Sequence, residues 1–270
     1  MKKVALVTGA SSGIGMETAK LLVEKGYTVY GAARRVDKMQ ELEKAGGLIL
    51  KMDVTDEASM VEGVHKILAA ENRIDVLVNN AGYGSYGALE EVPLSEARYQ
   101  FEVNIFGLAR LTQLVLPTMR EQHSGKIINI SSIGGKLGEP HGTWYHATKY
   151  ALEGLSDCLR MELKQFGIDV VIIEPGAIIT EWAGIARDNM LKVSGNGPYK
   201  ELVQKHAKMY ERTDKNGSKP IVVAKTIVEA IQANKPKTRY ATGGGAKPIL
   251  FMRRILSDRG FDKLFLRLMK

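Results

Sequence analysis

"KVALVTGASSGIG", residues 3–15, opens with a short apolar run rich in valine and passes through three glycines into "METAKLLVEKG", which has the composition of a helix. Gly9, Gly13 and Gly15 allow a tight turn and a close approach of the backbone to a pyrophosphate, which would rest on the positive end of the helix dipole. A glycine turn between a strand and a helix predicts a dinucleotide site, whereas the same glycines without that context would indicate only a tight turn.

The same alternation of apolar runs and helical segments continues along the chain. Short apolar runs, each followed by a turn, recur at residues 3–8, 28–33, 48–52, 75–79, 126–131, 169–174 and 238–242. Helical periodicity separates them at residues 14–25, 57–71, 96–121 and 145–166. Strands that are apolar along their whole length and alternate with helices predict a parallel sheet covered on both faces. We therefore expect an α/β fold, one doubly wound domain that spans residues 1–270.

Composition excludes several classes of protein. A chain of 270 residues with 44% hydrophobic content can bury one substantial core, and its net charge of +8 favours anionic ligands but is too diffuse to indicate nucleic acid. The single cysteine, Cys158, excludes an internal disulfide and fits a reducing, cytoplasmic location. No run approaches the length of a membrane span. His141 and His146 lack metal-ligand spacing, so no metal is expected.

Residues 180–219 interrupt the alternation of strands and helices. This segment is rich in lysine, asparagine, glycine and serine, with scattered large apolar side chains such as Trp182 and Tyr199. A long insertion in a compact domain is usually functional or disordered, and we interpret this one as a lid over a substrate.

The residues after the second expected strand indicate which dinucleotide is bound. An NAD site places a carboxylate there to hold the ribose 2′-hydroxyl, but this chain has Ala33 followed by Arg34 and Arg35. Guanidinium groups suit a 2′-phosphate in charge and geometry, so NADP(H) is predicted. The alternative is that both arginines are ordinary surface charges.

"WYHATKYALEG", residues 144–154, places Tyr145 and Lys149 four positions apart, on one face of a helix. An ammonium close to a phenol favours the phenolate, so we expect Lys149 to lower the pKa of Tyr145 and to make the pair a tuned acid and base. Two such residues on a solvated helix face would be the alternative explanation.

With the glycine turn, "NNAG" at residues 79–82 and the Tyr145/Lys149 pair in this order, the sequence resembles the short-chain dehydrogenase/reductase family over nearly its whole length. The resemblance implies a hydride-transferring enzyme on a single Rossmann-type domain, usually a homodimer or homotetramer. It matches Asn104 of "NIFG", Ser132 of "ISS", Tyr145 and Lys149 to the family's active-site residues. It also places Asp53 near the adenine and "PGAIIT", residues 175–180, at the nicotinamide.

The full set of cofactor contacts expected from the glycine turn, the arginines and the resemblance is Gly9, Ser11, Ser12, Gly13, Ile14, Gly15, Arg34, Arg35, Asp53, Val54, Asn80, Ala81, Gly82, Tyr145, Lys149, Pro175, Gly176, Ile178 and Thr180.

Elementary chemistry gives the four active-site residues separate roles. A ketone that gains a hydride develops negative charge on oxygen, so Tyr145 should donate a proton while Ser132 orients that oxygen. Lys149 would also hold the nicotinamide ribose, and Asn104 would position a water that links Lys149 to solvent. Ser132 could instead cap a turn and Asn104 satisfy a helix kink. A nucleophilic Ser132 paired with a histidine remains open, although no G-x-S-x-G elbow supports a hydrolase.

The substrate expected from these features is a secondary alcohol or ketone. "YHATKYALEGLSDCLRMEL" and the tail "KPILFMRRILSDRGFDKLF" are most similar to family members that act on steroids, retinoids and other lipophilic carbonyls. One alternative is a 3-oxoacyl-thioester reductase of the fatty-acid type. Another is a catalytically silent NADP(H)-binding sensor or scaffold, which should have lost Tyr145 or Lys149.

Residues 247–270 hold seven basic and two acidic side chains, interleaved with apolar ones such as Phe251 and Leu268. This pattern could lay a basic amphipathic segment on an anionic membrane as a weak peripheral contact. The alternative is that its apolar face packs on its own domain or on a second subunit.

Overall fold

The computed structural model describes residues 2–269, apart from the side chains of residues 213 and 214. Within that range one parallel sheet has the strand order β3-β2-β1-β4-β5-β6-β7. Its strands are β1 (Val4–Thr8), β2 (Thr28–Ala33), β3 (Leu48–Lys51), β4 (Val76–Asn79), β5 (Gly125–Ile130), β6 (Ile168–Pro175) and β7 (Arg239–Thr242). The predicted doubly wound sheet is confirmed, and each observed strand ends within one residue of its predicted bounds.

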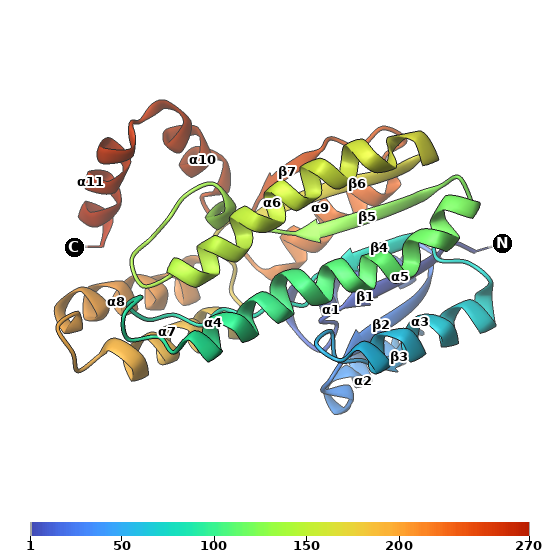
Figure 1. The fold of residues 1–270 in the computed structure, drawn as a ribbon, viewed down its shortest axis with the longest axis horizontal. Helices are drawn as coiled ribbons and strands as arrows, with labels where there is room; N and C mark the ends of the chain where they lie inside the picture. The colour runs from blue at the N-terminus through green and yellow to red at the C-terminus, as the bar shows by residue number, and fades with distance from the viewer. Residues whose placement is uncertain (1, 270) are drawn as a thin grey trace.

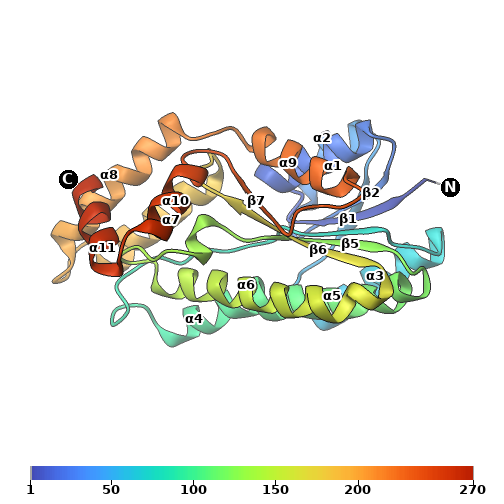
Figure 2. The ribbon, with the colours of Figure 1, turned by 90° about the horizontal axis from the view of Figure 1, so that it is seen from above.

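Helices cover both faces of the sheet, as Figure 2 shows from above. One face carries α1 (Gly13–Glu24), α2 (Gln40–Lys44) and α9 (Pro220–Gln232), and the other carries α3 (Glu57–Glu71), α4 (Leu94–Phe101), α5 (Gly107–Glu121) and α6 (Thr143–Leu163). Two apolar clusters fill the two layers: Met16, Leu22 and Ile227 belong to the first, and Ile67, Val115 and Met119 to the second. Because both faces are buried, β1 is buried at every residue, which explains its unbroken apolar run.

The helix predicted over residues 96–121 is interrupted. Its hydrogen-bonding pattern changes to a π-turn over Glu102–Phe106, between α4 and α5. Gly107, at the end of the turn, lies so close to Val54 that an added Cβ would stand 2.0 Å from the Val54 carbonyl oxygen. The π-turn contains Asn104, one of the predicted site residues, and such turns often occur at functional sites.

Four helices gather beyond the carboxyl ends of the strands, at the left of Figure 1. They are α7 (Glu181–Ser194), α8 (Lys200–Asn216), α10 (Ala246–Ile255) and α11 (Asp258–Leu268). The segment that interrupts the alternation, residues 180–219, thus forms the helices α7 and α8, which pack through Ala186, Met190 and Val203. Ligands of open α/β folds bind at this end of the sheet.

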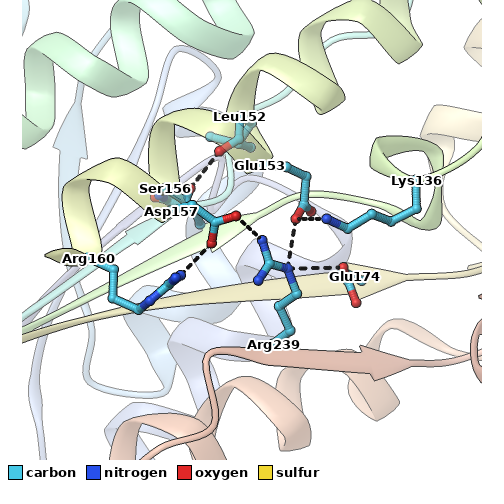
Figure 3. Close-up of polar contacts among 9 residues, drawn as sticks. Lys136, Leu152, Glu153, Ser156, Asp157, Arg160, Glu174 and Arg239 are labelled. Atoms are coloured by element: carbon cyan, nitrogen blue, oxygen red, sulfur yellow. Dashed lines mark hydrogen bonds and ion pairs between the residues drawn. The ribbon is translucent and has the colours of Figure 1, made fainter.

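A cluster of charges joins the edge strand β7 to α6 and β6 (Figure 3). The Arg239 Nε lies 3.0 Å from Glu153 Oε2, its NH2 lies 2.6 Å from Asp157 Oδ2, and its Nε lies 3.7 Å from Glu174 Oε1. Lys136 Nζ adds a second contact to Glu153 Oε2 at 2.9 Å. Since the side chains of Glu153 and Glu174 are each only 6% exposed, Arg239 and Lys136 together supply the counter-charge that lets the two carboxylates lie in the fold.

Candidate active site

A cavity of about 800 Å³ opens at the carboxyl end of the sheet, between the glycine turn and the four helices at that end. All the predicted site residues line it except Gly15 and Asn104. The chain therefore brings together in one hollow residues that lie as far apart in sequence as Gly9 and Thr180.

The glycine turn has the backbone that its sequence predicts. Gly9 and Gly13 have φ values of 66° and 55°, in the left-handed region that favours glycine. A Cβ on Gly15 would stand 2.4 Å from the Gly9 carbonyl oxygen, so Gly15 packs the start of α1 against the turn and does not face the cavity. Ser12 precedes α1 without a side-chain cap, which leaves the N–H groups of the first turn available to a phosphate.

The loop after β4 is tied to the glycine turn. Asn80 donates through Nδ2 to the Thr8 carbonyl at 2.9 Å, and the backbone N–H groups of Asn80 and Ala81 both donate to Thr8 Oγ1 at 3.0 Å. These bonds hold the two loops together on one side of the cavity.

A basic corner lies where β2 ends. Arg35 Nη2 is 3.5 Å from Ser11 Oγ, 3.4 Å from Ser12 Oγ and 3.0 Å from Oε2 of Glu181, the first residue of α7. Arg34 instead donates to the Tyr99 hydroxyl at 2.9 Å and lies 3.8 Å from Asp53 Oδ2. Two hydroxyls and a guanidinium at one point form a set of donors that fits a phosphate ester.

Lys38 and Glu181 belong to this corner but were missed from the sequence. Lys38 Nζ lies 3.4 Å from Glu181 Oε1, so Arg35 and Lys38 share one carboxylate. Lys38 follows Arg34 by four residues, about one helical turn, and this spacing could have predicted its place in the corner. Glu181 is distant in the sequence and reaches the corner only in the folded chain.

Tyr145 and Lys149 lie in the first turns of α6, and Ser132 lies in the loop after β5. Lys149 Nζ donates to the Ile130 carbonyl at 2.9 Å and stands 5.7 Å from the centre of the Tyr145 ring. Ser132 Oγ accepts from Gly134 N at 3.0 Å and also contacts the Tyr145 phenol. Ser132 thus caps a turn, which was its alternative explanation, while lying beside the tyrosine.

The electrostatics of the pair differ from the prediction. Burial raises the pKa of Tyr145, the contact with Ser132 lowers it, the charge of Glu139 raises it further, and the net shift is upward. Burial lowers the pKa of Lys149 to about 8, against a smaller upward effect of Glu153. The predicted net lowering of the pKa of Tyr145 is therefore wrong for this structure, because burial of the phenol outweighs any effect of the ammonium, which is hydrogen-bonded to the Ile130 carbonyl.

The side chain of Asn104 is fully engaged within the protein. Its Oδ1 accepts from Tyr83 N at 2.8 Å, and its Nδ2 donates to the Tyr83 carbonyl at 2.8 Å and to Thr148 Oγ1 at 3.0 Å. In the structure this side chain fastens the π-turn to the Tyr83 loop and to α6, as the helix-kink alternative expects.

Sequence reasoning also missed a polar cluster around Glu139, which lines the same cavity. The Tyr86 and Tyr210 hydroxyls both donate to Glu139 Oε1 at 2.8 Å, while His146 and His206 stand 3.6 Å from its carboxylate oxygens. "GEPHG", residues 138–142, was the available signal, but the partners come from three other segments.

The remaining walls are aromatic and aliphatic. The Trp182 ring lies 4.9 Å from that of Tyr145, centre to centre. Further apolar lining comes from α7, α8, α10 and α11, through Ile185, Met209, Ile249, Met252, Phe261, Leu264, Phe265 and Leu268. The predicted C-terminal segment 247–270, of which residue 270 lies outside the described part, therefore walls the cavity with part of its apolar face.

Neither a metal site nor a membrane span is found in the part of the chain that the structure describes. Residues 2–269 contain no group of three histidine, cysteine or carboxylate side chains placed to hold a metal. Likewise, none of the described helices has the length and apolar character needed to cross a membrane.

Comparison with known proteins identifies the family. A model of the short chain dehydrogenase family matches residues 3–190. The chain belongs to the short-chain dehydrogenase/reductase family. It is 37% identical over 243 residues to the 3-ketodihydrosphingosine reductase of Bacteroides thetaiotaomicron, covering 89% of this chain and 88% of that protein. It is 32% identical over 273 residues to human retinol dehydrogenase 8, covering 95% and 86%.

Solved structures of this family have the same fold. A short-chain dehydrogenase from Streptomyces avermitilis superposes with a TM-score of 0.81 at 36% identity, over 99% of this chain and 95% of that one. A family member from Burkholderia phymatum in complex with NAD gives 0.80 at 25% identity, over 94% and 92%. A metagenomic member in complex with NADP gives 0.69 at 29% identity, over 88% and 95%. The chain is thus an oxidoreductase of a family that binds nicotinamide cofactors.

Proposed function

We propose that the protein is an NADP(H)-dependent oxidoreductase that interconverts a lipophilic secondary alcohol and its ketone. The observation that carries this proposal is the meeting of Ser132, Tyr145 and Lys149 in one cavity whose other walls are apolar. A basic corner at the far end of the same cavity supports the choice of NADP(H).

The cofactor fits the residues that line the cavity. The uncapped start of α1 and the glycine turn would hold the pyrophosphate, and Arg34, Arg35 and the Ser11 hydroxyl would hold the 2′-phosphate. Asp53, Val54 and the loop at Asn80 would contact the adenine half, and residues 175–180 the nicotinamide half. When bound, NADPH supplies the hydride that reduces the substrate carbon.

The chain itself supplies the proton. Tyr145 donates its phenolic proton to the substrate oxygen as negative charge develops there, and the Ser132 hydroxyl donates a hydrogen bond to the same oxygen. Lys149, whose pKa is about 8, is mostly charged at neutral pH and stabilises the phenolate that remains. The burial that raises the pKa of Tyr145 keeps the phenol protonated until the substrate accepts the proton.

The apolar walls support a lipophilic substrate. The names of the two relatives, a 3-ketodihydrosphingosine reductase and a retinol dehydrogenase, agree with that choice. Reduction of a 3-oxoacyl thioester is the runner-up. A silent cofactor-binding scaffold is disfavoured because both Tyr145 and Lys149 are present and close together.

We also propose three features of the whole protein. The helices α7 and α8 act as a lid, since Trp182 of α7 lies against Tyr145. The protein forms a homodimer or homotetramer, supported by three exposed apolar side chains: Phe106 at the end of the π-turn, and Tyr150 and Met161 on α6, at 55%, 47% and 67% exposure. Its free, exposed Cys158 agrees with a reducing compartment such as the cytoplasm.

A cofactor and substrate panel tests the proposal. Oxidation of NADPH and of NADH is followed at 340 nm with a steroid ketone, a retinoid ketone, an aliphatic ketone and an acetoacetyl thioester. We expect turnover with NADPH and at least one of the first three carbonyls. Turnover of the thioester alone would favour the runner-up, and absence of turnover with every carbonyl would contradict the proposal.

A further inference from the structure

Glu139 is an unusual residue to find in an otherwise apolar half of the cavity. Its side chain is only 13% exposed, and it lines the cavity together with Tyr86, Tyr145 and Trp182. Burial raises the pKa of Glu139, but the contacts with His146 and His206 together hold it well below the usual range, so the carboxylate is charged. A buried charge in a ligand cavity calls for an explanation.

The two oxygens of this carboxylate are not equally occupied. Oε1 accepts from both the Tyr86 and the Tyr210 hydroxyl at 2.8 Å. Oε2 instead lies 3.6 Å from His206 Nε2, which is longer than a hydrogen bond. Among the described residues, His146 Nε2 and His206 Nε2 are buried and have no hydrogen-bond partner. The protein thus orients the carboxylate through two tyrosine hydroxyls on Oε1, while Oε2 has the longer charge contact with His206.

Aromatic rings cluster around Tyr86, whose hydroxyl binds the carboxylate. The Tyr86 ring lies 5.6 Å from that of Tyr145, 5.7 Å from that of Trp182 and 5.7 Å from that of Tyr210. The faces of tyrosine and tryptophan rings attract cations, and several rings beside a carboxylate form the kind of site that binds an ammonium group. These four rings and Glu139 all line the cavity.

From this geometry we propose that Glu139 and the rings of Tyr86, Tyr145, Trp182 and Tyr210 bind a substrate ammonium group, so that the substrate is an amino ketone or amino alcohol. The proposal rests on the proposed function and adds the substrate class to it. Tyr145 is both the proton donor and one of the rings, so the amino group lies within a few bonds of the reacting carbon. The apolar remainder of the substrate extends toward α10 and α11, along Ile249, Phe265 and Leu268.

The competing explanation is that the cluster only stabilises the fold, with His146 and His206 as internal partners of Glu139. The two explanations differ in what neutralising the carboxylate does. A structural role predicts that Glu139→Gln affects charged and neutral ligands alike. An ammonium site predicts that only the charged ligand loses affinity.

A binding experiment with the protein alone separates them without any turnover. The affinities of octylammonium and of 1-octanol are measured by calorimetry at pH 7.5 for the wild type, Glu139→Gln and Glu181→Gln. Glu181 is the matched control, because it is a carboxylate on the cofactor side of the same cavity. Thermal melting of each variant checks that it is folded.

We expect octylammonium to bind the wild type about ten- to a hundredfold more tightly than 1-octanol, as for a charge-assisted contact. Glu139→Gln should abolish that difference and leave 1-octanol unchanged, whereas Glu181→Gln should keep it. Equal binding of the two ligands by the wild type would overturn the proposal, as would equal weakening of both by Glu139→Gln.

Turnover then distinguishes this proposal from the proposed function. The oxidation of a 2-amino-3-decanol and of 3-decanol with NADP⁺ is compared at equal concentrations. We expect the wild type to prefer the amino alcohol at least about tenfold in kcat/KM and Glu139→Gln to lose the preference. Oxidation of 3-decanol with no preference contradicts the ammonium site and leaves the proposed function standing. If neither alcohol reacts, the proposed function fails and the binding experiment alone decides on Glu139.

Discussion

Lys149 shows how a single residue can oppose stability and serve chemistry. Its ammonium is buried, with one hydrogen bond to the Ile130 carbonyl at 2.9 Å. A pKa lowered from 10.5 to about 8 corresponds to about 3 kcal/mol of penalty for keeping the charged form in the fold. The same positive charge is what the phenolate of Tyr145 needs once its proton has gone. A residue that weakens the fold at neutral pH is more readily understood as part of the active site.

This penalty predicts a pH dependence of stability. Between pH 8 and 10.5 the unfolded chain still holds the Lys149 proton that the folded chain has released, so the free energy of unfolding rises with pH in that window. Between pH 8 and 9.5 the free energy of unfolding of the wild type should therefore increase by about 2 kcal/mol relative to that of Lys149→Met. Denaturant unfolding of both proteins at pH 7, 8 and 9.5 measures the difference. A constant difference across these values would show that Lys149 is not the buried charge described here.

The arginines after β2 predict a cofactor preference. Arg34→Ala and Arg35→Ala should each lower kcat/KM with NADPH by about ten- to a hundredfold, because each removes a charge-assisted contact to the 2′-phosphate. The NADH kinetics should barely change, and they serve as the internal control. Equal efficiency of the wild type with the two cofactors would contradict the assignment.

Residue spacing predicted that Tyr145 and Lys149 come together, but it did not predict their electrostatics. Tyr145 and Lys149 are four residues apart, so a helix brings them together whatever the fold around them. The direction in which the pKa of Tyr145 shifts depends on burial by Trp182 and Tyr86, which approach Tyr145 only when distant segments pack. Glu139 and His206 are likewise 67 positions apart in the sequence and meet only in the folded chain.

At the scale of the elements, β7 is attached to the domain by ion pairs as well as by its strand pairing with β6. It is an edge strand of four residues, and Arg239 joins it to α6 and β6 (Figure 3). Removing Arg239 would leave the buried carboxylates of Glu153 and Glu174 to share the single positive charge of Lys136. Paired buried charges of this kind are costly to break although they add little when intact.

We therefore expect Arg239→Ala to lower the free energy of unfolding by about 2–4 kcal/mol. Arg160→Ala is the matched control: it removes the partly exposed contact to Asp157 in the same cluster and should cost about 0–1 kcal/mol. Both values come from denaturant unfolding at neutral pH. Similar small losses for the two variants would mean that the cluster does not hold β7.

The break between α4 and α5 illustrates where prediction of elements from sequence stops. The apolar periodicity of residues 96–121 fits one helix, and helices do occupy both ends of it. At the π-turn, Gly107 comes close to Val54, and Asn104 is hydrogen-bonded to Tyr83 and Thr148. These contacts join segments distant in sequence, so the local apolar periodicity cannot predict them.

At the scale of the whole molecule, the order of apolar strands and helices was sufficient to predict the doubly wound sheet. A parallel strand buried on both faces must be apolar throughout, and that pattern is readable in a single sequence. The helices at the carboxyl end of the sheet were harder to predict. The helices α7 and α8 pack on each other, and Phe265 of α11 contacts His206 of α8. These contacts join distant segments, so no local sequence pattern predicts them.

Exposed apolar and basic side chains on α10 make the predicted membrane contact testable. Phe251 and Ile255 of α10 are 63% and 61% exposed, beside Arg253 and Arg254. We expect the intact protein to bind anionic vesicles weakly at low salt, and to lose that binding at high salt or on replacement of Phe251 and Ile255 by serine. Co-sedimentation measures this. Absence of binding at low salt by an active protein would leave α10 and α11 only as walls of the cavity.

The central claim, that the whole molecule reduces a carbonyl by giving it the Tyr145 proton, is tested most directly by comparing the wild type with Tyr145→Phe. Turnover is measured with NADPH and the best carbonyl of the panel, and NADPH binding is measured separately by fluorescence titration. The account predicts that the variant binds NADPH about as tightly as the wild type but loses about 10²- to 10⁴-fold in kcat. Retention of more than about half of the wild-type kcat, with NADPH bound, would contradict it.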